Sequence, residues 1–333
     1  MPVLSLAEVA LLARSALDRC GANPTQSEST GRSIRDAEAE GIRNVGLGYL
    51  PTYLLHLHCG KIIGSAIPRV GESNGSTLHV DAGFGFCHPA FEAALDPFVD
   101  LTKGQGVALL TISRSYSAGV LGWMVDLLAR RGLVSLGFAN SSPLVAPWGG
   151  RTARLGTNPI AFGCPRNDSP PFVVDMATSA TAYVNIRTAA EEGRDIPLGW
   201  AVDETGQPTT DPQKALQGTV APLGGAKGFG LGLLVEILAA GISGGNWGID
   251  SSSFGDDQGG PPGVGQAFIA IDSSRSAPGF GDRLEHLFSE LLSETGVRLP
   301  GDRRHECRAN AERHGVEVPA ELLAAIEAVG VTR

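Results

Sequence analysis

The sequence predicts a mixed α/β fold in which helices cover a central sheet. One pattern behind this prediction is the alternation of strand-like and helix-like segments between residues 77 and 140. The apolar runs Val107–Ser113 and Leu133–Asn140 flank a helix-like segment, GVLGWMVDLLARRG, and strands separated in this way are typical of an α/β layer. The other pattern is helical periodicity without strand-like runs over about the first 65 residues.

Composition limits the classes of protein to which the chain can belong. With 333 residues, 42% hydrophobic and 18% charged, the chain is globular and long enough for two domains. Its formal net charge of -9 and its lack of a long Lys/Arg run argue against a nucleic-acid partner. No apolar run reaches the length of about 18 residues that a membrane span needs, so no membrane partner is expected.

Two features predict a cytoplasmic protein. The N-terminal segment MPVLSLAEVALLARSALDRCG lacks the basic region and the long apolar core of a secretory signal. The five cysteines are odd in number and widely spaced, without a C-x-x-C motif. Such cysteines are expected to be reduced thiols in a reducing compartment.

Capping motifs define the first helices. Ser5–Glu8 is a capping box that opens an amphipathic helix, and Thr25–Glu28 is expected to open a second one in the same way. A third helix contains His56 and His58. Because helix residues two positions apart point to different faces, both are expected to be ordinary helix residues, and no metal site is predicted.

A loop-rich segment runs from Val145 to Ser179. It contains a Gly/Pro-rich loop, a short strand over Pro159–Cys164, a polar turn, and an apolar run over Phe172–Val174 that stops at DMATS. Small and hydroxylated residues gather at both loop ends, where backbone N–H groups can approach a bound anion. The same composition also fits polar turns between core strands.

A second glycine-rich segment, PLGGAKGFGLGLLVE, begins at Pro222. Gly224, Gly225 and Gly228 surround Lys227 just before an apolar helix, and a cation at a helix N-terminus suits a phosphate group. The spacing is not that of a Walker loop, and no G-x-G-x-x-G motif follows a predicted strand, so the Rossmann fingerprint is absent. A glycine-rich helix packed closely against a neighbour is the alternative reading.

A long loop without periodicity follows this helix. It spans residues 244–265 and has the sequence GGNWGIDSSSFGDDQGGPPGVG. Loops of this length inside a domain are usually functional or mobile, so a lid or a dimer contact is expected here.

Six motifs occur in order along the chain: VAPWGG, LGTNPIAF, DMATS, IPLGWAVDETGQPTTDP, PLGGAKGFGLGLLVE and RLPGDRR. With them the chain resembles the type-2 malate/L-lactate dehydrogenase family. The resemblance implies an NAD(P)-dependent reductase of 2-oxo acids, ureidoglycolate, diketogulonate, sulfopyruvate or cyclic imino acids. It also implies a homodimer whose non-Rossmann nucleotide-binding domain is inserted in a helical domain.

The resemblance predicts how the chain divides into domains. Residues 1–70 form an N-terminal helical region, and residues 71–220 and 262–276 form the central α/β nucleotide-binding domain. Residues 221–261 and 277–333 supply C-terminal helices that complete the helical domain. The site is expected between the two domains.

The family's contacts to NADH or NADPH can be carried across to this chain residue by residue. Most of them fall in the loops that the residues themselves mark as suited to an anion. These contacts are Asn140, Pro147, Gly149, Gly150, Thr157, Asn158, Asp175, Met176, Ala177, Thr178, Ser179, Ala226, Lys227, Pro300, Gly301 and Asp302.

The catalytic half of the family pattern is rewritten. Where the family reads G-I-x-S-H-G-x-x-R, this chain has GIRNVGLGY, so Val45 replaces a histidine and Tyr49 an arginine. After the strand VALLTIS, the family's N-S-x-H-F-G is RSYSAG, so Ser117 replaces a second histidine. Asn185 stands at the position of the customary lysine.

Three explanations fit these replacements. A cyclic imine substrate accepts hydride as its iminium and needs no general acid at that step, whereas a ketone becomes an alkoxide that does. Alternatively, Tyr116 or Tyr49, together with Ser117, supplies the proton to a C=O group. The third explanation is a catalytically degenerate chain that binds nucleotide or a partner without redox turnover.

A small substrate that bears a carboxylate needs a cation, and the family's arginine is absent. Arg43, Arg114 and Arg151 lie in loops near the predicted site, and Asn44 lies beside the first of them. An arginine can bind a carboxylate in a bidentate fork, so these residues are the candidates for substrate binding. A surface salt bridge is the alternative role for each arginine.

Overall fold

The computed structural model describes residues 1–329 and has a mixed α/β fold, as predicted. Its centre is a seven-stranded sheet with the order β2-β3-β4-β11-β5-β6-β7. β3 and β4 are parallel, and every other neighbouring pair is antiparallel. The strands are β2 (Arg69–Val70), β3 (Thr77–Asp81), β4 (Val107–Ser115), β5 (Val134–Ala139), β6 (Ile160–Cys164), β7 (Phe172–Met176) and β11 (Val264–Ile271).

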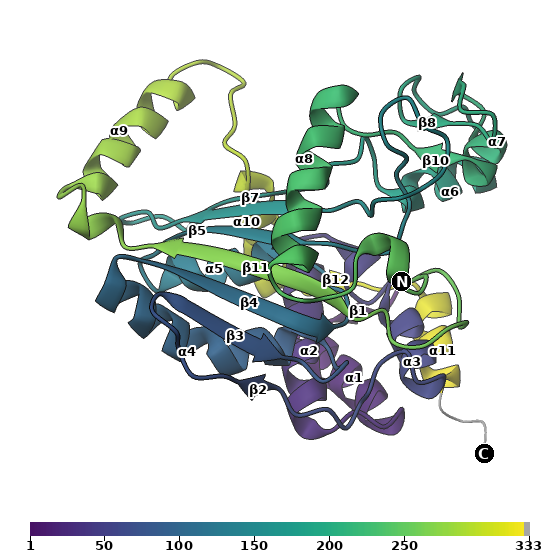
Figure 1. The fold of residues 1–333 in the computed structure, drawn as a ribbon. Helices are drawn as coiled ribbons and strands as arrows, with labels where there is room; N and C mark the ends of the chain where they lie inside the picture. The colour runs from purple at the N-terminus through teal and green to yellow at the C-terminus, as the bar shows by residue number, and fades with distance from the viewer. Residues whose placement is uncertain (330–333) are drawn as a thin grey trace.

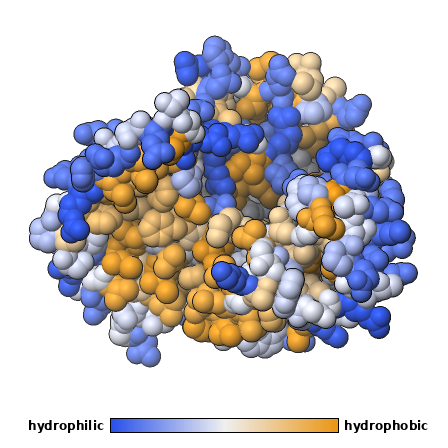
Figure 2. Space-filling view, turned by 90° about the horizontal axis from the view of Figure 1, so that it is seen from above, coloured by the Kyte–Doolittle hydropathy of each residue, from blue (hydrophilic) through white to orange (hydrophobic). Residues whose placement is uncertain are grey.

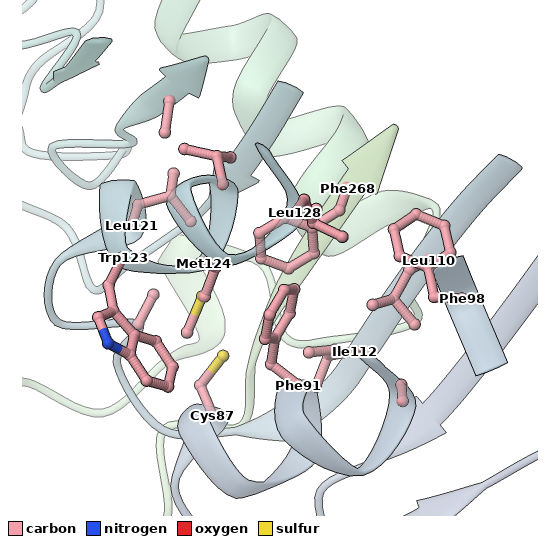
Figure 3. Close-up of a cluster of buried hydrophobic side chains, with 14 of the residues drawn as sticks. Cys87, Phe91, Phe98, Leu110, Ile112, Leu121, Trp123, Met124, Leu128 and Phe268 are labelled. Carbon is pink, nitrogen blue, oxygen red and sulfur yellow. The ribbon is translucent and has the colours of Figure 1, made fainter. Parts of the chain in front are cut away.

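Helices α4 (Cys87–Gln105) and α5 (Leu121–Arg130) cover one face of this sheet. Their apolar side chains meet those of the central strands in a closed core, where Phe91, Met124 and Phe268 are fully buried (Figure 3). Burial of each such side chain stabilises the fold by roughly 1.5–3 kcal/mol. The predicted alternation of strand and helix therefore gives one helix-covered face.

The first helices begin at side-chain caps. α1 (Leu6–Arg19) has the predicted capping box, with both bonds between Ser5 and Glu8 present. α2 (Pro24–Ala39) begins one residue before the predicted capping box, which is wrong: the side chain of Asn23 is the cap and accepts the Gln26 amide at 3.0 Å. Proline favours the first helical position because it has no N–H to leave unpaired, and this sets the start.

The two ends of the described chain form one helical unit with the third helix, α3 (Leu50–His58). Side chains from α1, α2 and α3 share one buried cluster with residues near the C-terminus, such as Ala311 and Ile326. A short antiparallel pair, β1 with β12, fixes the ends beside each other. The remaining members are α10 (Asp302–His314), α11 (Ala320–Ala328), β1 (Val3–Leu4) and β12 (Val316–Glu317).

A small unit with its own core stands apart from the main sheet (Figure 1). It leads into α8 (Ala226–Glu236), which continues as a π-helical turn, Ile237–Gly241, packed on the sheet's second face. α9 (Phe280–Leu292) projects from the other end of the sheet. The unit comprises β8 (Ala201–Val202), β9 (Pro208–Thr209), β10 (Thr219–Val220), α6 (Tyr183–Glu192) and α7 (Pro212–Gln217).

The sequence-based domain boundaries stay predictions. The separate core of the small unit lies within the stretch assigned to the central domain. None of the helices between residues 1 and 329 is long and apolar enough to cross a membrane.

Candidate active site

Two loops predicted from separate motifs lie against each other at the end of β7. The amide of Thr178 donates to the carbonyl of Thr157 at 2.9 Å, and the amide of Leu223 donates to the carbonyl of Thr178 at the same distance. Ser179 also pairs with Pro222 as an isolated β-bridge. The DMATS motif and the glycine-rich segment before α8 therefore form one surface.

The VAPWGG loop lies over the start of α8. A Cβ on Gly225 would come within 3.0 Å of the Trp148 ring, so only a glycine fits beneath it. Gly149 and Gly224 have φ values of +83° and +60° with open space around them. α8 has no side-chain cap, and Lys227 lies in its first turn. This end of α8 suits an anion such as a pyrophosphate.

Two predicted cofactor contacts belong to a buried network behind this surface. Asn158 Nδ2 donates to Glu236 Oε2 at 2.7 Å, and Asn140 Nδ2 donates to Glu236 Oε1 at 3.2 Å. The Gly248 amide donates to the same Glu236 Oε1 at 2.6 Å. Glu236 thus connects α8 to these loops through hydrogen bonds. The sequence did not suggest this role, because Glu236 is a single charged residue within the apolar segment that forms α8. Asn158 Oδ1 is buried without a partner within the described chain.

A second group of predicted contacts lies on the helix-covered side of β7. Asp175 Oδ2 accepts the Gly122 amide at 3.0 Å and lies 3.6 Å from Arg304. Burial raises the pKa of Asp175, and Arg304 partly opposes this rise. A Cβ on Gly301 would lie 3.0 Å from the Val173 carbonyl. Gly301 therefore approaches the backbone of β7 at Val173, while Met176, the neighbour of Asp175, is 43% exposed and, by strand alternation, faces the other side.

Three tyrosines form a cluster at the start of α3 and the end of β4. The ring centroids of Tyr49 and Tyr53 are 4.9 Å apart, and those of Tyr53 and Tyr116 are 5.8 Å apart. Burial raises the pKa of all three phenols. Two of the three predicted catalytic residues are thus neutral phenols, and Tyr116 is only 1% exposed.

His56 holds Tyr116 in place, which the sequence prediction of an ordinary helix residue did not foresee. His56 Nε2 faces the Asp256 carbonyl at 2.9 Å and must donate to it, so Nδ1 is the acceptor for the Tyr116 hydroxyl at 2.5 Å. Nothing in the sequence indicated this role, because His56 and His58 lie on different faces of the helix and neither belongs to a motif. Residues 1–329 contain no group of three or more His, Cys, Asp or Glu side chains that could hold a metal ion.

The predicted lid, residues 244–265, is docked on α3. The buried Lys61 Nζ donates to the carbonyls of Ser253 and Asp256 at 2.5 and 2.8 Å. The Phe254 ring packs edge-to-face on Tyr116 with a centroid distance of 4.9 Å. The loop therefore covers the tyrosine cluster, and its role as a lid or dimer contact stays a prediction.

The third predicted catalytic residue, Ser117, lies in the loop between β4 and α5. Its Oγ accepts the Gly119 amide at 3.2 Å. Ala118 and Leu121 next to it are buried in the main core, and Val45 packs against the same core. Both positions of the family's missing histidines thus border apolar surroundings.

The predicted substrate arginines do not converge. Arg43 Nε donates to Glu38 Oε2 at 3.1 Å, and Arg114 Nε donates to Asp81 Oδ1 at 2.8 Å, so both guanidinium groups are paired. Arg151 lies against Gly206 in the small unit, because a Cβ on Gly206 would come within 3.1 Å of the Arg151 Cβ. Asn44 is exposed in the 3-10 turn Arg43–Val45.

A cation that the sequence analysis missed lies on α6. Burial raises the pKa of Tyr49, while a hydrogen bond with Tyr116 and the charge of Arg187 on α6 act in the opposite direction. Arg187 is largely exposed, and its only ion pair among the described residues is with Glu191 at 3.8 Å. Asn185, at the position of the family's lysine, donates to Thr181 Oγ1 at 3.0 Å.

Comparison of the sequence with known proteins shows which family the chain resembles. A family model described as malate/L-lactate dehydrogenase matches residues 4–327. The chain is 39% identical to a (2R)-3-sulfolactate dehydrogenase (NADP(+)) from Chromohalobacter salexigens, over 99% of both chains. It is 38% identical to a Δ1-pyrroline-2-carboxylate reductase from Ancylobacter novellus, over 98% of this chain and 97% of that one.

A solved structure of a related enzyme has the same fold as this chain. The structure of Δ1-piperideine-2-carboxylate reductase from Pseudomonas syringae pv. tomato superposes with a TM-score of 0.94 at 36% identity, over 99% of this chain and 100% of that one. The match covers the sheet, the helical unit and the loops described above. The chain therefore belongs to the malate/L-lactate dehydrogenase family, whose members are NAD(P)-dependent oxidoreductases.

Proposed function

We propose that this protein reduces the C=N bond of a small cyclic imine that carries a carboxylate, with hydride from NADPH. The observation that carries the proposal is the absence of an ionisable acid at Val45 and Ser117, where the family has histidines. The phenols nearby are weaker proton donors than usual, because burial raises the pKa of Tyr49 and Tyr116. Such a site suits a substrate that needs no proton from the protein during hydride transfer.

The chemistry of the two substrate classes differs at this point. A cyclic imine binds as its iminium, with the nitrogen already protonated. Hydride adds to the imine carbon, the C=N π electrons become the nitrogen lone pair, and a neutral secondary amine leaves. A ketone in the same place becomes an alkoxide, and the loss of a general acid typically costs 10²–10⁴-fold in rate.

The cofactor loops fit a dinucleotide. The uncapped start of α8, Lys227 and the open glycines at positions 149 and 224 can cradle a pyrophosphate. When bound, the nicotinamide supplies the hydride, and the residues of this chain hold it. The choice of NADPH is supported by the name of the sulfolactate dehydrogenase relative, which specifies NADP(+).

The substrate carboxylate needs a partner, and Arg187 fits best. The Arg43 and Arg114 guanidinium groups are already paired with Glu38 and Asp81. The pair of Arg187 with Glu191 is long and exposed, so it costs little to exchange for a substrate carboxylate. Its charge also lowers the pKa of Tyr49, against the larger rise that burial causes.

We also propose that the protein is a homodimer. Its accessible surface is 15314 Å², whereas a compact monomer of this mass exposes about 13,000 Å². Seen from above, a broad apolar face spans the second side of the sheet (Figure 2). Exposed apolar side chains of α8 and the segment after it include Leu231, Leu234, Ile237, Ile242 and Trp247. A face of this kind is typical of a protein interface.

We further propose a cytoplasmic location. All five cysteines are unpaired, as is usual for proteins of a reducing compartment.

The test is the oxidation of NADPH and NADH by the purified protein with Δ1-pyrroline-2-carboxylate, Δ1-piperideine-2-carboxylate, 3-sulfopyruvate and pyruvate. We expect kcat/KM with NADPH to be at least about 100-fold higher for an imine than for either ketone. A preference for sulfopyruvate would overturn the C=N assignment. Cofactor binding without turnover of any substrate would favour the degenerate alternative.

A further inference from the structure

Two arginines on α10 pair with two acids on α2. Arg308 Nη1 donates to Asp36 Oδ1 at 3.0 Å, and its Nη2 donates to Glu40 Oε1 at 2.9 Å. Arg304 Nη1 lies 3.9 Å from Glu40 Oε2. Because residues four apart project from the same side of a helix, both arginines face α2 and both acids face α10. The four side chains are between 10% and 25% exposed, so this network is largely shielded from water.

The start of α5 is held between these elements. The Gly122 amide donates to Asp175 Oδ2 at 3.0 Å, and Trp123 Nε1 donates to Asp36 Oδ2 at 2.9 Å. Arg304 Nη1 lies 3.6 Å from the same Asp175 oxygen. A Cβ on Gly122 would lie 2.8 Å from Arg304 Nη1 and 3.0 Å from Asp175 Cβ. The guanidinium group of Arg304 therefore packs directly on the first turn of α5.

The network joins two segments that belong to the proposed site. Pro300, Gly301 and Asp302 form the turn at which α10 begins, and the Arg304 amide donates to the Gly301 carbonyl at 2.9 Å. This turn is carried across from the family as a cofactor contact. Ser117 lies in the loop that leads into α5, at the place of the family's second histidine. Arg304 thus connects a predicted cofactor contact to the loop of a predicted catalytic residue.

We propose that Arg304 is a positioning residue for hydride transfer. By joining the Asp175 carboxylate to the start of α5, it fixes the loop that carries Ser117 relative to the cofactor turn. In this role Arg304 touches neither the substrate nor the cofactor. The inference rests on the proposed imine reduction. It also gives the Asp175 side chain, which the family resemblance places at the cofactor, a part in the contact between the two segments.

Errors in orientation act on the chemical step rather than on binding. The cofactor turn is closed by its own bond, in which Asp302 Oδ2 accepts the Leu299 amide at 3.0 Å. The loop before α5 is closed between Ser117 Oγ and the Gly119 amide at 3.2 Å. Without Arg304 each segment therefore keeps its shape, while the geometry between hydride donor and acceptor changes. A misplacement of about 1 Å can cost about 100-fold in rate.

A single-turnover experiment tests this role. NADPH-loaded R304Q and wild type are mixed with saturating Δ1-piperideine-2-carboxylate, and NADPH absorbance is followed by stopped flow. We expect the first-order rate constant of hydride transfer to fall about 100-fold in R304Q and to recover in part in R304K. The Kd for NADPH should change less than about 3-fold. A merely structural role would lower the amplitude, because fewer molecules are folded, and leave the rate constant unchanged. A wild-type rate constant in R304Q, or loss of NADPH binding, overturns the proposal.

R166Q is the matched control. Arg166 donates to both carboxylate oxygens of Glu285 at 2.9 and 2.6 Å, and its side chain is 15% exposed. This pair joins the segment between β6 and β7 to α9. R166Q should lower Tm much as R304Q does, because each breaks a partly buried ion pair, and should keep the wild-type rate constant. If R166Q slows hydride transfer as much as R304Q, the loss of any ion pair is sufficient and the proposal fails.

A second variant disturbs the same contact without removing a charge. G122A places a Cβ 2.8 Å from Arg304 Nη1, so the guanidinium group must move. We expect the rate constant to fall about 10-fold in G122A. The double variant G122A/R304Q should be slower than R304Q by no more than about 2-fold, because both changes act on one contact. Losses that multiply in the double variant would show that Gly122 and Arg304 act independently, which contradicts the proposal.

Hydrogen exchange separates this proposal from the proposed function. In the wild type, we expect saturating NADPH to slow amide exchange over residues 117–125 about 10-fold, because the cofactor turn and the start of α5 are joined. In R304Q the same occupancy should slow it by no more than about 2-fold. If the wild type reduces no imine but this difference holds, the reaction assignment fails and the connection through Arg304 stands. Equal effects of NADPH in the two proteins overturn the connection, whatever the turnover.

Discussion

The proposed cofactor side and the proposed reaction side of this protein, called below the cofactor side and the reaction side, differ in what they are made of. The cofactor side consists of backbone: glycines 149, 224 and 225, an uncapped helix start, and loops joined by main-chain bonds. The reaction side consists of side chains from α3 and the β4–α5 loop, including two phenols whose pKa is raised by burial. The family pattern is kept in the first and rewritten in the second. A backbone-built site tolerates little change, while side chains can be exchanged for a new substrate.

The largest expected effect comes from restoring the family's residues on the reaction side. The double variant V45H/S117H should raise kcat/KM for 3-sulfopyruvate about 100-fold, because a histidine can protonate the alkoxide. The measurement is NADPH oxidation at saturating cofactor. As a control, V45L/S117A changes the same positions without adding an acid and should give no gain. If V45H/S117H also fails to raise kcat/KM for 3-sulfopyruvate, these two positions do not face the substrate.

On the cofactor side, we expect the next largest effect from a side chain at Gly225. The G225A variant places its Cβ 3.0 Å from the Trp148 ring at a φ of +74°, which pushes the VAPWGG loop off α8. The Kd for NADPH should rise about 10-fold or more, as measured by nicotinamide fluorescence. G193A, at a φ of +66° with no neighbour, is the matched control and should bind normally. If G225A binds NADPH with the wild-type Kd, the VAPWGG loop does not contribute to cofactor binding.

A charge change at the same helix should be milder. K227A removes the cation from the first turn of α8, and we expect the Kd for NADPH to rise several-fold with kcat at saturation nearly unchanged. K214A on α7 removes an exposed lysine of the small unit as a control. A fall in kcat without a change in Kd would argue that Lys227 acts on the substrate instead.

The tyrosine cluster should show a coupling in stability. H56F leaves the buried Tyr116 hydroxyl without its acceptor and should lower the free energy of unfolding by about 1–3 kcal/mol. In H56F/Y116F the orphaned hydroxyl is gone, so the double variant should be less destabilised than the sum of H56F and Y116F. Urea unfolding of the four proteins measures the coupling, and strict additivity would contradict the hydrogen bond.

The smallest effect concerns Asp175, whose pKa is raised by burial. A carboxyl with a raised pKa in the folded state contributes stability at low pH, and this contribution is lost as pH rises through that pKa. D175N removes the titrating group and keeps an acceptor for the Gly122 amide. The unfolding free energy of D175N relative to wild type should therefore increase as the pH rises above about 4, the ordinary pKa of an aspartate. A difference that decreases with pH would show that Arg304 dominates over burial.

Much of the fold could be predicted from local patterns. The capping box at Ser5, the strand after Val107 and the helix after Gly225 are each specified by neighbouring residues, and the structure has all three. The central place of β11 could not be predicted, because it depends on pairing with β4 and β5 more than a hundred residues away. The start of α2 was missed because Asn23 and Pro24 compete with the capping box that follows.

The candidate site follows the same rule: features set by neighbouring residues could be predicted, and features set by contacts between distant elements could not. Glycine spacing marked the loops beside Trp148 and Lys227, since backbone conformation leaves a signal in the sequence. His56 left none, because it acquires its role from a partner on another element. Arg187 was missed because no motif marks it, and its electrostatic effect on Tyr49 depends on the folded structure.

The central claim is that the reaction side suits a cation that needs no acid, and one ratio tests it most directly. The measurement is kcat/KM for Δ1-piperideine-2-carboxylate divided by kcat/KM for 3-sulfopyruvate, both with NADPH, in the wild type and in V45H/S117H. The account predicts a wild-type ratio above about 100 that falls at least about 10-fold in the double variant. A wild-type ratio below one, or a ratio that the added histidines leave unchanged, would contradict it.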